Sequence, residues 1–297
     1  ALSSAASDVY KRQIQSGLVP CIHLERVFRQ AAESLIVTNA HAIVRGEMPD
    51  LGCRTGDFFF LEQPDAFAQQ RLVVDLVSRR LPKSYGYDPL RDIQVITPAK
   101  QGPLGTRELN RLLQGKLNPP ERGKGEATLM GRTLREGDKV MQIRNNYDII
   151  WQQPDGTAGT GIFNGDMGII EMLDPGSKTI QVRFEEKLAT YSFENQDQLE
   201  HAYAVTVHKS QGSEFEAVVM PLERRHPKLH YRNLLYTAVT RARKLLIMTG
   251  QKETVYAMVQ NNRRTLRYTN QKEMLQEMCD ELSLIHISEP TRLRCIS

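Results

Sequence analysis

Apolar residues in the first part of the chain recur with helical and strand periods in turn. Residues 31–45 carry apolar side chains at helical spacing and are followed by Gly46, a residue type that commonly ends a helix. Residues 64–81 form a second helical stripe that begins at a proline. Two strand-length apolar runs and one further helical stretch complete the pattern, at 57–61, 93–97 and 104–113. This alternation predicts an α/β fold, with a parallel sheet and helices on both of its faces.

The pattern changes to short β-type runs between residues 131 and 197. These runs are DKVMQIR, DMGIIEML, TIQVRF and ATYSF. The turn signals between them are Gln153-Pro154-Asp155-Gly156, Asn164-Gly165-Asp166 and Asp174-Pro175-Gly176. Several short strands in so few residues predict a small all-β barrel inserted into the α/β domain.

The α/β pattern resumes after this insert. Residues 200–211 have enough β-branched side chains for a strand, but we interpret them as a helix ended by Gly212. The reason is that FEAVVMPL, which begins at Phe215, is the better strand. A final apolar run, LLIMTG, predicts another strand.

The composition is that of an ordinary globular protein with a mild excess of positive charge. Of 297 residues, 40% are hydrophobic and 25% are charged, and the net charge of +4 permits a polyanionic partner without requiring one. The sequence shows neither an apolar run of membrane-spanning length nor a secretory signal. Four scattered cysteines without a C-x-x-C pair suggest neither a zinc site nor a disulfide framework, so a cytoplasmic location is expected.

Both ends of the chain look foreign to the rest. ALSSAASDVYKRQ at residues 1–13 and LSLIHISEPTRLRCIS at residues 282–297 resemble translated sequencing-adapter read-through. The alternative is that they are genuine tails. We expect native sequence from about residue 14 to about residue 281.

Two stretches in the last third of the chain carry the most specific signal. AYAVTVHKSQGSEFEAVVMPL begins at Ala202, and LLYTAVTRARKLLIM begins at Leu234. Together they resemble the last two signature motifs of superfamily 1 helicases. A phosphate-binding loop, G-x-x-x-x-G-K-[ST], does not occur in the sequence, since the GK pairs at Gly115 and Gly123 lack the hydroxyl residue. The chain therefore resembles the back half of such a motor.

Further motifs narrow the resemblance to one branch. FRQAAES, TPAKQGPLG and REGDKVMQIRNNYD, with GIFNGDMGII, resemble the long, stand-alone RecD-like helicases of bacteria. The resemblance covers nearly all of residues 14–281. It implies a second RecA-like domain at 14–130 and 198–281, an SH3-like insert at 131–197, and 5′-to-3′ DNA unwinding driven by ATP.

Two arginines are candidates for contact with the γ-phosphate of ATP. A phosphoryl-transfer transition state needs a fixed cation, and arginine is permanently charged and bidentate. The resemblance assigns this role to Arg241, in TAVTRARK, and to Arg29, in VFRQ. The implied nucleotide-binding neighbours are Gln30, Gly212, Ser213 and Glu214. The resemblance implies that ATP and Mg²⁺ are bound mainly by an N-terminal half that this sequence does not contain.

Short polar side chains mark a candidate DNA track. TPAKQGPLG follows the run at 93–97, and ligands of open α/β sheets bind where strands end. The residues that the resemblance places on DNA are Thr97, Lys100, Thr206, His208, Lys209 and Ser210. Three aromatic residues of the insert, Tyr147, Trp151 and Phe163, suit either base stacking or packing within the insert.

Three functions remain open at this level. The first is the C-terminal part of a monomeric ATP-dependent helicase that acts on single-stranded DNA and duplex junctions. The second is a non-catalytic module that binds single-stranded DNA. The third is the helicase part of a conjugative relaxase. A metal site within this chain, or a membrane partner, is not expected.

Overall fold

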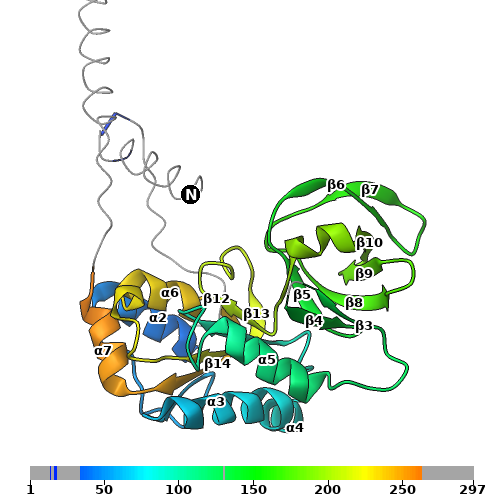
Figure 1. The fold of residues 1–297 in the computed structure, drawn as a ribbon. Helices are drawn as coiled ribbons and strands as arrows, with labels where there is room; N and C mark the ends of the chain where they lie inside the picture. Colours follow the sequence, from blue (N-terminus) through cyan, green and yellow to red (C-terminus); the bar gives the residue numbers. More distant parts are fainter. Residues whose placement is uncertain (1–13, 15–16, 19–33, 130, 263–297) are drawn as a thin grey trace, which may run out of the picture. The chain divides into compact units, whose positions relative to one another are not determined.

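A five-stranded parallel sheet forms the centre of the α/β part of the protein (Figure 1). The computed structural model describes residues 14, 17–18, 34–129 and 131–262. The strands, in their spatial order, are β1 (Phe58–Glu62), β14 (Ala242–Gly250), β13 (Phe215–Pro221), β2 (Ile93–Thr97) and β12 (Ala204–Thr206). All four neighbouring pairs are parallel, which confirms the predicted sheet type.

Two layers of helices cover the two faces of this sheet, as the sequence pattern predicted. One layer packs against Phe58, Val218 and Leu246, and its helices are α2 (Leu35–Arg45), α6 (Arg232–Val239) and α7 (Lys252–Gln260). The other packs against Val95, Val219 and Leu245, and its helices are α3 (Ala66–Asp75), the π-helical turn η1 (Leu76–Arg80), α4 (Leu81–Tyr85) and α5 (Thr106–Leu117).

Helix ends follow the capping residues in the sequence. The Ser34 side chain accepts a hydrogen bond from the backbone of Val37, and Gly46 ends α2 with a φ of 85°, as expected. The helix predicted at 64–81 runs on to Gly86 through the π-helical turn. Pro82 explains this turn, because proline lacks an N–H and clashes with the preceding helical turn.

The predicted helix at 200–211 is wrong. The chain there forms β11 (Leu199–His201), then β12, and then a turn at 207–212. Residues 202–207 are buried, and the Asn110 side chain bonds the backbone N–H and C=O of Ala204. A strand that is covered on both faces has a continuous apolar pattern, so its periodicity does not distinguish it from a buried helix.

The insert is an antiparallel β-structure, as predicted. Seven strands pair in the order β11, β5 (Lys139–Gln142), β8 (Met167–Asp174), β9 (Thr179–Phe184), β10 (Lys187–Ser192), β6 (Asn146–Gln152) and β7 (Ala158–Ile162). A separate hairpin joins β3 (Glu126–Leu129) to β4 (Arg132–Arg135). The hydrophobic core of the insert includes Leu134, Ile170 and Tyr191. The strands thus extend beyond 131–197 on both sides.

The remaining elements are short. Two 3₁₀ turns complete the fold, η2 (Phe193–Gln198) before β11 and η3 (Pro227–Leu229) before α6. The expected foreign tails at 1–13 and 282–297 lie outside the described residues, and so do Arg29 and Gln30.

Candidate nucleic-acid and nucleotide site

The sheet places the two groups of candidate residues at opposite edges. Thr97 ends β2 and Thr206 ends β12, and the two residues are paired in register. Both therefore lie at the carboxyl edge of the sheet. Phe215 and Ala242 are paired at the other end, so Ser213, Glu214 and Arg241 lie just before the strands at the amino edge. Residues 207–214 join the end of β12 to the start of β13, and they therefore run from the carboxyl edge to the amino edge.

The loop after β2 is held from within by Thr97. Its side chain is buried, and its hydroxyl donates a 2.7 Å hydrogen bond to the carbonyl of Leu104. The Thr97 hydroxyl is therefore engaged in shaping the loop. Lys100, in the same loop, is exposed.

Two more hydroxyls of the expected DNA track also face inwards. Thr206 is buried and accepts a hydrogen bond of 3.3 Å from the backbone N–H of Lys209. Ser210 is fully buried and donates to the carbonyl of Val207 at 2.8 Å. These side chains fold the turn after β12, so direct contact of their hydroxyls with DNA is not supported.

His208 is exposed and Lys209 is partly exposed in this turn. The His208 Nε2 atom lies 3.2 Å from the Tyr231 hydroxyl, and the Lys209 ammonium lies 2.8 Å from Glu200. Burial alone would raise the pKa of Glu200, but the positive charges of Lys209 and Lys100 lower it overall. Lys100 and Lys209 therefore lie close enough to the same carboxylate, Glu200, for both of their charges to affect its pKa.

Arg241 is fixed at the amino edge by its neighbours. Its Nε donates to the carbonyl of Thr237 at 3.0 Å, one terminal nitrogen donates to the carbonyl of Ser213 at 3.1 Å, and the other donates to the Thr240 hydroxyl at 3.2 Å. A guanidinium has five N–H donors. One N–H therefore remains on each terminal nitrogen of Arg241, and each can donate to a further acceptor such as a phosphate oxygen.

The other nucleotide candidates lie beside Arg241 in sequence or space. Gly212 has a φ of 90°, which favours glycine, and it begins the approach to β13. Glu214 lies 3.8 Å from Arg243, whose side chain is 59% exposed. The structure thus brings Ser213 and Arg241 together, and it leaves Arg243 on the surface with Glu214 and Glu216.

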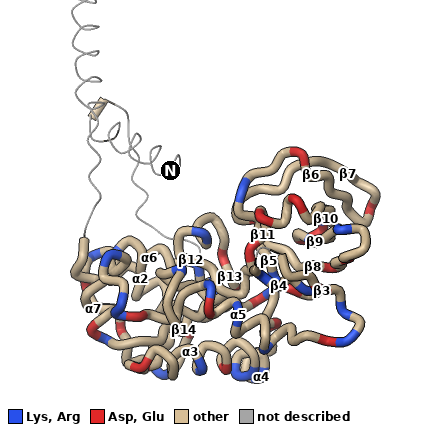
Figure 2. Tube along the Cα trace, viewed as in Figure 1, with Lys and Arg blue, Asp and Glu red and all other residues tan. Residues whose placement is uncertain are grey.

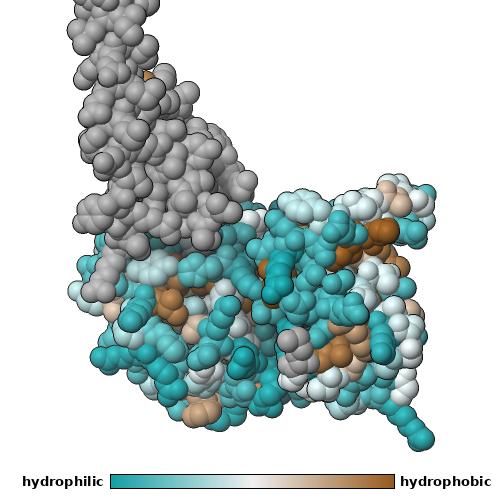
Figure 3. Space-filling model, turned by 45° about the horizontal axis from the view of Figure 1, so that its top comes forward, coloured by the Kyte–Doolittle hydropathy of each residue, from teal (hydrophilic) through white to brown (hydrophobic). Residues whose placement is uncertain are grey.

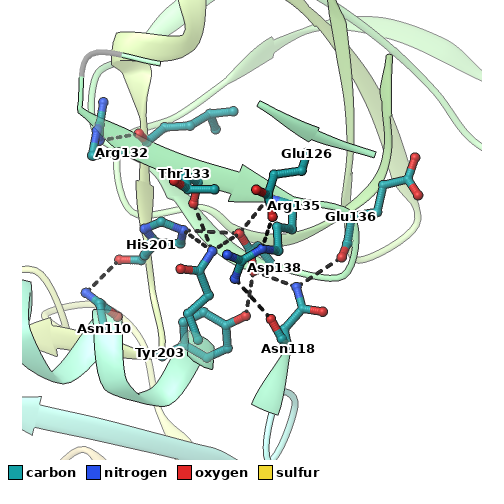
Figure 4. Close-up of polar contacts among 12 residues, drawn as sticks. Asn110, Asn118, Glu126, Arg132, Thr133, Arg135, Glu136, Asp138, His201 and Tyr203 are labelled. Atoms are coloured by element: carbon teal, nitrogen blue, oxygen red, sulfur yellow. Dashed lines mark hydrogen bonds and ion pairs between the residues drawn. The ribbon is translucent and has the colours of Figure 1, made fainter. Parts of the chain in front are cut away.

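A buried carboxylate joins the insert to the α/β part, and sequence analysis did not find it (Figure 4). Asp138 is fully buried in the turn between β4 and β5. Its oxygens accept hydrogen bonds from Gln114, Asn118 and Tyr203, at 2.7, 2.6 and 2.9 Å. The Nε2 atom of His201 lies 3.1 Å away. Burial would raise the pKa of Asp138, but His201 and the other donors lower it overall.

Lys139 also reaches from the insert to the α/β part and is itself buried. Its ammonium donates to the carbonyl of Ile93, where β2 begins, at 3.3 Å. Burial lowers the pKa of Lys139 to about 8, against the opposing charges of Asp88 and Asp92. The insert is therefore anchored to the strand that leads into the loop carrying Lys100.

The aromatic residues of the insert divide into two environments. Tyr147 and Phe163 are 65% and 42% exposed, and their rings meet edge-to-face at 5.6 Å. Trp151 packs against Gly159, and the Lys187 ammonium lies 4.8 Å from its ring. The surface is otherwise mainly hydrophilic in the view of Figure 3. Trp151 thus packs against its neighbours in the insert, whereas Tyr147 and Phe163 pack on each other and stay exposed.

Neither a metal centre nor a membrane span is found in the part of the chain that the structure describes. Its histidine, cysteine and acidic residues do not gather in threes as a metal ion would need. None of its helices combines the length and the apolar character required to cross a bilayer.

The family comparisons agree with this architecture. Residues 109–184 match the SH3 domain of ATP-dependent RecD-like DNA helicases, and residues 201–249 match the UvrD-like helicase C-terminal domain. The fold and the motifs define the C-terminal RecA-like domain of a superfamily 1 helicase with an SH3-like insert. Within that class, the chain belongs to the RecD-like family.

Individual relatives are much longer than this chain. The ATP-dependent RecD2 DNA helicase of Deinococcus radiodurans is 34% identical over 231 residues, 78% of this chain and 29% of that protein. The RecBCD enzyme subunit RecD of Mycolicibacterium smegmatis is 27% identical over 63% of this chain and 30% of that protein. A Bacteroides Pif1 helicase in complex with ADP-AlF3 and ssDNA aligns with a TM-score of 0.45 and 16% identity, over 88% of this chain and 57% of that one.

Proposed function

We propose that this chain serves as the C-terminal part of an ATP-dependent 5′-to-3′ DNA helicase. In this proposal the carboxyl edge of the sheet holds single-stranded DNA and the amino edge faces ATP. The observation that carries it is the separation of the two residue groups, with residues 207–214 as their direct connection. Translocation requires such a link, because hydrolysis at one site must move the chain at the other.

On the DNA side, Lys100 and His208 are exposed and Lys209 is partly exposed. Lysine ammonium groups neutralise phosphates and release counterions, which favours binding without sequence preference. The buried hydroxyls of Thr97, Thr206 and Ser210 keep the two loops in shape. The surface carries interleaved charges of both signs (Figure 2), so binding relies on these local groups rather than on a strong overall field.

On the nucleotide side, Arg241 offers its two remaining N–H groups to the γ-phosphate, and the carbonyls of Thr237 and Ser213 hold it in place. Arg29, Gln30, Gly212, Ser213 and Glu214 stay in the proposal as nucleotide-side neighbours. The described residues offer no cluster of acidic ligands for Mg²⁺. The proposal therefore assigns the metal and most triphosphate contacts to a partner domain, which closes over Arg241.

The DNA side is tested by fluorescence anisotropy with a labelled oligo-dT strand over a range of salt concentrations. Lys209→Ala and Lys100→Ala should weaken binding and each reduce the salt slope by about 0.7, the value for one phosphate contact on a single strand. Lys83→Ala, an exposed change in α4, is the matched control. Salt-independent binding, or equal losses in all three variants, would contradict the proposal.

The rival function is a non-catalytic module that binds single-stranded DNA. It shares the DNA side but gives Arg241 no role, so ATP turnover of the full-length protein with and without Arg241 separates the two functions.

A further inference from the structure

A third loop leaves the carboxyl edge of the sheet, and it is basic. It follows β13 and covers residues 223–230, with the sequence ERRHPKLH. Arg224, Arg225 and Lys228 are all exposed. Arg225 pairs with Glu223 at 3.4 Å, whereas Arg224 and Lys228 form no ion pair within the described residues. The loop therefore presents two uncompensated positive charges to solvent.

The sheet order places this loop beside the proposed DNA track. The strands β12, β2 and β13 are consecutive in the sheet, so their carboxyl ends follow one another at intervals of about 4.8 Å. A methyl group at Gly102, in the loop after β2, would lie 3.6 Å from both the Glu223 Oε2 and the His226 Nε2 atoms. The loop after β13 thus packs directly against the loop that carries Lys100.

The loop has a defined shape. The His230 Nε2 atom donates to the carbonyl of Glu223 at 2.7 Å and closes the loop on itself. Burial lowers the pKa of His230, which keeps this imidazole neutral near pH 7. Asn261 donates to the carbonyl of His230 and ties the base of the loop to the end of α7. Arg224 and Lys228 therefore belong to a loop whose backbone is fixed by hydrogen bonds.

One buried polar atom in this loop is unsatisfied. The Nε2 atom of His226 is enclosed without a hydrogen-bond partner in the described part of the chain. A buried polar group without a partner destabilises the fold and calls for a specific explanation. This atom lies beside Gly102, where the two loops meet.

We propose that residues 223–230 form a third segment of the DNA track, in which Arg224 and Lys228 bind backbone phosphates of single-stranded DNA. This inference rests on the proposed function of the carboxyl edge and extends it from two loops to three. The single-stranded DNA would pass from the turn after β12, over Lys100, to the loop after β13. Contacts to phosphates alone imply binding without base preference.

The test compares two double variants in the same anisotropy experiment. Arg224→Gln with Lys228→Gln should weaken oligo-dT binding and lower the salt slope by about 1.4, for two phosphate contacts. The matched control is Arg91→Gln with Lys83→Gln, which removes the same charge from exposed residues elsewhere, Arg91 being at the amino end of β2. The control should retain the wild-type slope.

Three outcomes would overturn the inference. If both double variants lose affinity equally, net charge explains the effect. If the loop variant binds like wild type while Lys209→Ala is weakened, the track ends at the loop after β2 and the proposed function survives. If the wild-type chain does not bind oligo-dT at low salt, the proposed function fails together with this extension.

Discussion

The Tyr203 hydroxyl donates a 2.9 Å hydrogen bond to the Asp138 carboxylate, although the two residues belong to different parts of the fold. Asp138 lies in the insert, whereas Tyr203 immediately precedes β12, the strand that leads to the turn with His208 and Lys209. Burial and the adjacent carboxylate both raise the pKa of Tyr203, so it remains a donor at all ordinary pH values. The insert is thus hydrogen-bonded to the residue that precedes β12.

Asp138→Ala should destabilise the protein by about 3 kcal/mol or more, because it leaves several buried donors without an acceptor. The lowered pKa of Asp138 means that its contribution is complete above the ordinary value of 3.8 and is lost as pH falls below it. Urea unfolding at neutral pH and at low pH measures both effects. Asp155→Ala, in an exposed turn, is the control and should change stability little.

Lys139→Met should give a more stable protein at pH 7. The folded-state pKa of about 8 lies below the ordinary 10.5, so below pH 8 the wild type carries a charging cost of about 3 kcal/mol. Between pH 8 and 10.5 the unfolded chain binds more protons, so wild-type stability rises with pH. The advantage of the variant should shrink over that interval. The measurement is the free energy of unfolding of both proteins as a function of pH. If the two pH profiles are parallel, the pKa of Lys139 is not lowered in the folded protein and the prediction is wrong.

Gly105→Ala should distort the loop after β2. A β-carbon at this position would lie 2.5 Å from the backbone of Gln101, although the φ of −75° itself suits any residue. We expect a loss of about 1–3 kcal/mol from this overlap, with weaker binding of oligo-dT. Gly105 is the N-cap residue of α5, and Gly115 lies within that helix with open space around it. Gly115→Ala should therefore stabilise the protein by up to about 1 kcal/mol. Equal effects of both changes would contradict the steric argument.

Arg241→Ala in the full-length protein should reduce ATP turnover by about 10³-fold or more, as for other transition-state arginines. Arg241→Lys should recover little of it, since an ammonium cannot reproduce the fork that bonds Thr237 and Ser213. Arg243→Ala, two residues away and exposed, serves as the control. Steady-state ATPase assays with saturating DNA decide the matter, and near-normal turnover of Arg241→Ala would remove Arg241 from the nucleotide site.

Sequence patterns predicted those parts of the fold that depend on local repetition. Residues 179–184 alternate between buried and half-buried positions and form β9 with the expected bounds. Residues 200–211 were misassigned because burial on both faces removes that alternation. Asp138 escaped notice because its partners, Gln114 and Tyr203, are 24 and 65 residues away and no local pattern marks them.

For the candidate site, the sequence motifs name residues but not the directions of their side chains. Ser213 and Arg241, both named as nucleotide-side candidates, are in contact in the structure. The motifs did not show which hydroxyls point inwards, because the inward orientation of Thr97 depends on the carbonyl of Leu104, seven residues further on. The direction of a short polar side chain is set by the folded backbone, and the sequence gives no periodic signal for it.

The connection at 207–214 has a consequence for how this region tolerates changes in length. It spans the height of the sheet in eight residues and delivers Phe215 opposite Ala242, and the register of every later position in β13 depends on that start. One inserted residue would exchange the two faces of a strand that is buried on both sides. The turn at residues 153–156, between β6 and β7, is exposed at its tip and has room for additional residues. Natural variation in length should therefore concentrate in the insert, whereas the stretch from Val207 to Glu214 keeps a constant number of residues.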